Sequence, residues 1–298
     1  MTNPHEANHD HPFEAEIDHA IAGGELFFLH QPQVDLTTGN VIGSEALIRW
    51  FHRDLGMLSP GAFLPRLASA RALDSLTYFA VDSAIAQWKA WEATGVRLPV
   101  AVNVTPLVLA SEEFPLRVAR AVERAAIPAG MLKLEITEET LISDGTRAAE
   151  VIGFLGGCGV GFSIDDFGAG YSSLSHLLDF EICEVKIDRS FVEAMPADAR
   201  ARRIVAALTK LARELGITTV GEGVSSATVA ESLFASGCTV GQGFHLAMPM
   251  PARDIPAFVC GAGSAVQAGA ASPSTAPDAH YRNHDPVRDG QHANEQTR

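Results

Sequence analysis

Several short apolar runs in this sequence are followed at once by a carboxylate, amide or ammonium side chain. The carboxylates at such positions are Glu45, Glu135, Asp165, Asp166 and Glu222, and the other polar residues are Asn103, Lys186 and Gln242. Any one of them alone is more often a solvent-facing strand end than a ligand. Five carboxylates gathered in one place, however, would raise one another's pKa unless cations neutralised them. Hard oxygen ligands suit Mg²⁺ or Mn²⁺, and adjacent Asp165 and Asp166 could serve two ions, as two-metal phosphoryl transfer requires.

Lys186 is one of only four lysines in the chain, and it follows one of these apolar runs. Its ammonium could hold and polarise a metal-bound water molecule. A plain salt bridge to one of the acids is an equally consistent interpretation.

The segment 166–173 (DFGAGYSS) directly follows the run that ends in the two aspartates. Gly168 and Gly170 give its backbone freedom, and Ser172 and Ser173 can cap a following helix. As a phosphate cradle, Gly-x-Gly is a weak signal. Beside two predicted metal ligands it indicates a mobile catalytic loop.

The runs that carry these residues read as strands separated by helices. They are typical of strands buried on both faces, and they cover residues 25–33, 41–48, 99–104, 131–136, 161–166, 183–188, 217–222 and 239–244. Helical patterns include 74–94, 197–215 and 225–237, with Ser225 as candidate N-cap of the last. Eight strands alternating with helices predict a TIM-like (β/α)8 barrel, whose C-terminal strand ends meet at one mouth. The link 30–40, with its Thr38-Gly39-Asn40 turn, is too short for a crossover helix, so we expect an antiparallel first strand.

Composition limits the class of protein further. The chain has 298 residues, 47% hydrophobic and 19% charged, as in globular domains. Its net charge of −14 argues against long nucleic acid as a partner, but not against a phosphorylated ligand held through cations. Four dispersed cysteines predict reduced, mostly buried thiols. With no signal peptide and no apolar stretch near 18 residues, we expect a cytoplasmic protein without membrane contact. We expect one domain at 13–260 between disordered tails at 1–12 and 261–298.

Taken together, these residues resemble the motifs of the EAL-domain phosphodiesterases, which hydrolyse the second messenger cyclic di-GMP. The matching segments are QPQVDLTTG at 31–39, EALIRW at 45–50, AVNVT at 101–105, LEITE at 134–138, DDFGAGYSS at 165–173, KID at 186–188, GEGV at 221–224 and QGF at 242–244. They occur in the family's order without evident insertions. The resemblance covers about residues 13–259.

The resemblance implies a role for each matching position. Two divalent cations, Mg²⁺ or Mn²⁺ with Ca²⁺ inhibitory, would be coordinated by Glu45, Asn103, Glu135, Asp165, Asp166 and Glu222. The residues implied in catalysis are Lys186, which contacts the attacking water, Gln242 and Glu222, which order the water and metals, and Glu138, which anchors loop 166–173. The substrate site would be lined by Gln31, Leu47, Arg49 on a phosphate, and Asp188, which also supports the second metal site.

The resemblance also implies the product linear 5′-pGpG and a homodimer formed through residues 174–178 and the 203–215 helix. Because the sequence shows no second domain, we expect control through the short tails, dimerisation, metal availability or an unknown regulatory protein partner. Two departures are expected to tune rate or metal affinity. Ser225 stands where the family often has Glu, and Leu67-Ala68 stands where an Ala-Glu pair is usual. A non-catalytic receptor for cyclic di-GMP, or an interaction module of the same fold, is the main alternative. A general nuclease or another metal-dependent phosphohydrolase is a third.

Overall fold

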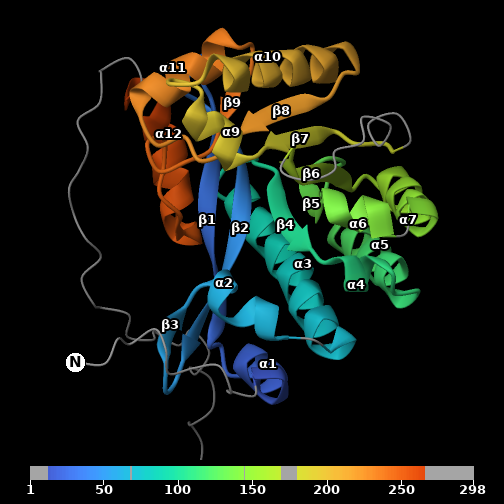
Figure 1. The fold of residues 1–298 in the computed structure, drawn as a ribbon. Coiled ribbons are helices and arrows are strands. Elements are labelled where there is room, and N and C mark those ends of the chain that lie inside the picture. Colours follow the sequence, from blue (N-terminus) through green and yellow to red (C-terminus); the bar gives the residue numbers. More distant parts are fainter. Residues whose placement is uncertain (1–12, 68, 144, 169–179, 266–298) are drawn as a thin grey trace, which may run out of the picture.

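Eight strands close into a barrel in this computed structural model, which describes residues 13–67, 69–143, 145–168 and 180–265 (Figure 1). Around the ring the strands are β1 (Leu26–Asp35), β2 (Val41–His52), β4 (Val100–Val104), β5 (Leu132–Thr137), β6 (Gly161–Phe167), β7 (Glu184–Ile187), β8 (Thr218–Gly221) and β9 (Val240–Gly241). Pairing of β1 with both β2 and β9 closes the ring. The predicted TIM-like (β/α)8 barrel is confirmed.

The first strand runs opposite to the rest of the barrel. β1 is antiparallel to β2 and β9, whereas the neighbouring pairs from β2 to β9 are parallel. The link to β2 is a tight turn in which Asp35 Oδ1 accepts hydrogen bonds from the backbone N–H of Thr37 (2.8 Å) and Thr38 (2.9 Å). Such a turn can join only antiparallel strands. The expected antiparallel first strand is confirmed, and its register places Gln31 opposite Glu45.

Helices cover the outside of the barrel (Figure 1). The described helices are α1 (Phe13–Ala22), α2 (Pro60–Phe63), η1 (Leu64–Arg66), α3 (Ala70–Glu92), α4 (Pro106–Leu109), α5 (Glu113–Ala125), α6 (Glu138–Ser143), α7 (Gly145–Gly157), α9 (Arg189–Ala194), α10 (Ala199–Glu214), α11 (Ala227–Ala235), η2 (Ala252–Asp254) and α12 (Ile255–Ala265). The longest, α3, is capped by Ser69, whose side chain accepts a hydrogen bond from the N–H of Ala72. It buries Trp88 and Trp91 in the main apolar core, which fixes the barrel from outside.

Three short elements have no counterpart among the predicted strands and helices. β3 (Gly56–Leu58) extends the far end of β2, β10 (Met250–Pro251) pairs with β1, and α1 packs Phe13 against Trp50. Strands of two or three residues carry no periodic signal of their own. Figure 1 shows the β1–β2 hairpin projecting beyond the barrel toward β3 and α1.

Two local predictions were wrong. The N-cap of α11 is Ser226 rather than Ser225: its hydroxyl accepts from the N–H of Val229, three residues on, as a cap requires. The cysteines are free as predicted, but they are not mostly buried. Cys238 is buried, Cys158 is half-buried, and Cys183 and Cys260 are exposed.

Helix α12 runs to Ala265 and so crosses the predicted domain boundary at residue 260. The small residues between 261 and 265 continue the helix that begins at buried Ile255. Several predictions lie outside the described residues. They concern the tails at 1–12 and 266–298, Ala68, the caps Ser172 and Ser173, most of loop 166–173, and the interface segment 174–178. No helix in the part that the structure describes has both the length and the apolar character needed to span a bilayer.

Candidate active site

The interior of the barrel is lined by two polar layers. Because strand side chains alternate between faces, each pair two residues apart points inward from the same strand, as with Lys133 and Glu135 on β5 or Glu184 and Lys186 on β7. In the lower layer, Glu184 contacts Lys133 and accepts hydrogen bonds from Gln33 (3.4 Å) and Ser163 (3.2 Å). TIM barrels usually fill this space with bulky apolar side chains. Here polar side chains fill it, which indicates a site.

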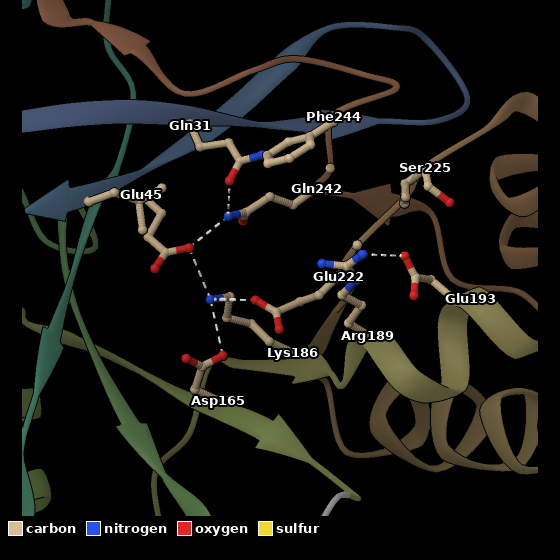
Figure 2. A pocket seen from close by; sticks show the side chains of 14 residues that line it. Gln31, Glu45, Asp165, Lys186, Arg189, Glu193, Glu222, Ser225, Gln242 and Phe244 are labelled. Carbon is tan, nitrogen blue, oxygen red and sulfur yellow. Dashed lines mark hydrogen bonds and ion pairs between the residues drawn. The ribbon is translucent and has the colours of Figure 1, made fainter. Parts of the chain in front are cut away.

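The upper layer is organised around the ammonium of Lys186. This side chain is 1% exposed, and its Nζ forms ion pairs with Glu45 (3.1 Å), Glu135 (3.0 Å), Asp165 (3.0 Å) and Glu222 (2.7 Å). Figure 2 shows the pairs with Glu45, Asp165 and Glu222. The four carboxylates come from β2, β5, β6 and the end of β8. The structure therefore brings together four of the six predicted metal ligands around the predicted catalytic lysine. The sequence suggested one salt bridge between Lys186 and an acid, and the structure shows ion pairs to four acids.

Amide side chains fix the orientation of Glu45. Asn103 Nδ2 donates to Glu45 Oε1 (2.8 Å), and Gln242 Nε2 donates to Glu45 Oε2 (2.6 Å). Gln242 Nε2 also donates to Gln31 Oε1 (3.3 Å), whose own amide donates to the carbonyl of Ala247 (3.2 Å). These residues lie on β1, β2 and β4 and just after β9, so the closed ring itself holds the carboxylate in place.

The charges in this layer shift one another's pKa. Burial raises the pKa of Glu135 well above its ordinary value, and the charge of Glu45 raises it further. Burial raises the pKa of Glu222 to about 7, against the attraction of Lys186. For Lys186, burial opposes the charge, but Glu135 and Glu45 outweigh it and hold its pKa well above the ordinary value. For Glu45, burial is outweighed by Lys186, Gln242 and Asn103, so its pKa is lowered. The layer thus combines a buried cation with carboxyl groups whose pKa values are shifted in opposite directions.

The pKa of Glu222 predicts how metal-free protein responds to pH. Because this carboxyl titrates near pH 7 when folded and near 4.5 when unfolded, the folded state binds more protons between these values. Its contribution to stability is full below pH 4.5 and is lost as pH rises through 7, a change of up to about 3 kcal/mol. We expect Glu222→Gln to remove this part of the pH dependence in urea unfolding with EDTA at pH 5, 6, 7 and 8. If the unfolding free energy of the two proteins changed with pH in the same way, the raised pKa of Glu222 would be contradicted.

A cluster of oxygen donors beside Lys186 fits a divalent cation. Carboxylate oxygens of Asp165, Asp166 and Glu222 lie within 4.8 Å of one another. Asp166 has a left-handed backbone (φ +52°), which departs from regular strand geometry where the pairing of β6 with β7 shifts in register. Within the described part of the chain, Glu135 Oε1 and Gln242 Oε1 are buried acceptors without a hydrogen bond. Unsatisfied buried oxygens next to an acidic triplet are what a hard cation would complete.

A cavity of about 290 Å³ opens onto this layer (Figure 2). Seven of the predicted site residues line it: Gln31, Glu45, Leu47, Asp165, Lys186, Glu222 and Gln242. Asn103 and Glu135 contact this set from beside the cavity through Glu45 and Lys186. The predicted ligand and substrate residues therefore converge, although they are spread over about 200 positions of the sequence.

Three predicted residues are placed apart from the cavity lining. Arg49 shares a face of β2 with Glu45 and Leu47, but its guanidinium donates to the carbonyl of Ile48 (2.8 Å). Asp188 is the N-cap of α9 and accepts from the N–H of Ser190. Glu138 is buried where β5 passes into α6, and the loop that it is predicted to anchor lies mostly outside the described residues.

The structure adds cavity residues that sequence reasoning did not assign to the site. Arg189, Glu193, Ser225 and Phe244 line its outer part. Arg189 and Glu193 form an ion pair of 2.7 Å on one face of α9. The available signals were the position of Arg189 directly after KID and the spacing of four residues to Glu193, which places the two side chains together on a helix.

The barrel, the mouth lined with carboxylates and the buried lysine define a TIM-like barrel with a candidate metal-dependent site. The sequence model of the family described as the EAL domain matches residues 14–249 of this chain. The chain belongs to the EAL domain family.

Named relatives agree with this assignment. Two proteins of Pseudomonas aeruginosa are 34% identical: cyclic di-GMP phosphodiesterase RocR over 240 residues (80% of this chain) and cyclic di-GMP phosphodiesterase PA2567 over 235 residues (78% of this chain). A solved structure described as the PaMucR phosphodiesterase in complex with c-di-GMP has a TM-score of 0.76 and 35% identity, covering 81% of this chain and 98% of that one. The chain spans 61% of RocR and 40% of PA2567, less than two thirds of either relative.

Proposed function

We propose that this protein is a cyclic di-GMP phosphodiesterase that hydrolyses its substrate to linear 5′-pGpG with two divalent cations, Mg²⁺ or Mn²⁺. The observation that carries the proposal is the convergence of the acidic residues on Lys186 at the mouth of an EAL-domain barrel. The relatives named as phosphodiesterases of this substrate support it.

In this proposal the cations are held by Glu45, Asn103, Glu135, Asp165, Asp166 and Glu222. Bound there, they would supply Lewis-acid stabilisation of the phosphate oxygens and make water a better nucleophile. A carboxyl group must be ionised to bind a cation, and the pKa of Glu135 and of Glu222 is raised, so metal affinity should rise with pH.

The side chains of this protein bind the substrate, orient the attacking water and keep other water out. Lys186 donates a hydrogen bond to the attacking water, and Gln242 holds Glu45 and Gln31 in register on either side. The water oxygen forms a bond to phosphorus while the bond to the ribose 3′-oxygen breaks, and the proton lost by the water is balanced by one gained at that oxygen. Leu47 supplies an apolar wall. Arg49 would reach a phosphate by leaving the carbonyl of Ile48, Asp188 would support the second metal site, and Glu138 would anchor the loop.

The experiment that tests this function is chromatographic. Purified protein is incubated with cyclic di-GMP and Mg²⁺ or Mn²⁺, and pGpG is measured over time. We expect product with either metal and none with EDTA or with Ca²⁺ in place of Mg²⁺. Tight binding without product would show a receptor instead. Cleavage of a single-stranded oligonucleotide or of cyclic di-AMP at a similar rate would show a broader phosphohydrolase.

The proposal includes a homodimer in the cytoplasm and a regulatory protein partner. The α10 face contributes the exposed apolar side chain of Ile204 to the predicted contact region. Light scattering coupled to size-exclusion chromatography tests the dimer directly: a monomer at all concentrations would contradict it.

A further inference from the structure

The two ends of the cavity differ in how their positive charge is balanced. Among the described residues that line it, the cationic side chains are Lys186 at the inner end and Arg189 at the outer end. Lys186 is surrounded by four carboxylates and is buried. Arg189 is paired with Glu193 alone, and its side chain is 65% exposed. Of these two cations, only Arg189 is exposed to solvent and paired with a single carboxylate.

The side chain of Arg189 is positioned by the loop after β8. Gly223 has φ +66°, and a Cβ atom there would come within 2.2 Å of Arg189 Cγ and 2.8 Å of its Cδ. Glycine thus leaves the space through which the stem of Arg189 passes, directly beside Glu222. The loop is itself fixed, because Val224 N–H donates to the carbonyl of Gln242 (3.0 Å) and His245 N–H donates to that of Val224 (3.0 Å). The stem of Arg189 therefore lies along this fixed loop, and Figure 2 shows its guanidinium paired with Glu193 at the cavity lining.

The pair that Arg189 makes with Glu193 is one that a phosphate can displace. It is an exposed contact between residues four apart on a helix, and such pairs are weak in water. Nearby Ser225 is neutral, so at that position of the lining no second carboxylate competes for the guanidinium. A guanidinium binds phosphate through two parallel hydrogen bonds, more strongly than it binds an exposed carboxylate.

We propose that Arg189 binds the second phosphate of the substrate, the one that is not hydrolysed. This inference rests on the proposed function, because cyclic di-GMP carries two phosphates and only one can lie at the Lys186 end. The guanidinium then sets the orientation of the dinucleotide and the preference for a substrate with two phosphates. Arg189 is a substrate-binding residue in this account, and it takes no part in bond breaking.

The test compares Arg189→Gln with wild type on two substrates. One is cyclic di-GMP, and the other is bis(p-nitrophenyl) phosphate, a diester with a single phosphate. For cyclic di-GMP we expect KM to rise about tenfold with kcat within about twofold, the cost of one charge-assisted contact. The preference for cyclic di-GMP over the single diester, as a ratio of kcat/KM, falls about tenfold. Arg189→Lys should lie between, because an ammonium keeps the charge without the fork.

A matched control is available in the Arg97–Glu92 pair. It has nearly the same exposure (74% and 37%, against 65% and 37%) and lies away from the cavity lining. Arg97→Gln should leave both kinetic constants for both substrates unchanged. Glu193→Gln, which frees the guanidinium, should lower KM for cyclic di-GMP.

Failure of this inference is distinguishable from failure of the proposed function. If wild type hydrolyses cyclic di-GMP and Arg189→Gln leaves its KM within twofold, or raises KM equally for both substrates, the inference is wrong. If wild type hydrolyses nothing but binds cyclic di-GMP in calorimetry, the hydrolase proposal fails. A tenfold weaker Kd for Arg189→Gln would then still support the phosphate contact, and an equal Kd would overturn it. Absence of binding by wild type would overturn both.

Discussion

Glu45→Ala is expected to lower the turnover of cyclic di-GMP at least about a thousandfold while the barrel stays folded. Glu45 is 5% exposed and joins three parts of the site: the ammonium of Lys186, the amide of Gln242 and the amide of Asn103. In the proposed function it is also a metal ligand. Its removal therefore takes away a metal ligand and leaves the amides of Asn103 and Gln242 without their shared acceptor. Lys186 keeps three other carboxylates, so the charge balance of the fold survives.

Glu184 provides a matched control for this variant. It is 2% exposed, and it too is bound by a lysine, a glutamine and one further donor, namely Lys133, Gln33 and Ser163. It lies in the lower polar layer, away from the mouth. Glu184→Ala should lower stability in urea unfolding by an amount similar to Glu45→Ala, with turnover within about threefold of wild type. Full activity of Glu45→Ala, or equal loss in both variants, would contradict the metal assignment.

The fold was predictable from the sequence where strands are long enough to carry a pattern. The run 131–136 became β5 at Leu132–Thr137, and the run 161–166 became β6 at Gly161–Phe167. The antiparallel β1 followed from the length of one turn. The small elements were not predictable in this way. β3 and β10 form because they pair with β2 and β1, so their existence depends on tertiary contacts rather than on local preference.

The site was predictable to the extent that it lies at strand ends. Strand alternation and barrel closure bring Glu45, Glu135 and Lys186 together without further information. The place of Arg49 depends on its rotamer, since strand alternation points it the right way and a hydrogen bond to Ile48 takes it elsewhere. Arg189 lies on a helix, and its place in the cavity depends on a glycine in another loop. Contacts of this kind are set by packing between elements, which a single sequence does not reveal.

The inner layer shows why one lysine lies among so many acids. Buried carboxylates without a counterion would be costly, and hydrolysis by two cations requires several of them close together. In metal-free protein, Lys186 supplies the positive charge that these carboxylates face, and burial raises the pKa of Glu135 and of Glu222. If the proposed function is right, Lys186 makes this cluster of carboxylates compatible with a folded barrel before cations bind.

Lys186→Met is therefore expected to have two large effects. Without the ammonium, Glu45 and Asp165 are left without their shared counterion, and removal of one partner from a buried pair costs about 3–5 kcal/mol of unfolding free energy. We expect this loss in EDTA at pH 8. It should shrink at pH 5, where more of the carboxyl groups are protonated. In the proposed function the attacking water also loses its hydrogen-bond donor, so turnover should fall at least about a thousandfold.

Addition of Mg²⁺ separates the role of Lys186 from a merely structural one. If cations occupy the same carboxylate layer, Mg²⁺ at a hundred times its Kd should restore up to about 2.7 kcal/mol of stability to Lys186→Met, but it should not restore turnover. Lys133→Met is the control, because Lys133 pairs with Glu184 in the lower layer. Lys133→Met should be less stable than wild type, and this difference in unfolding free energy should be the same with and without Mg²⁺. Its turnover should stay near that of wild type. Equal stability of Lys186→Met and wild type in EDTA at pH 8 would show that the ammonium does not balance these carboxylates.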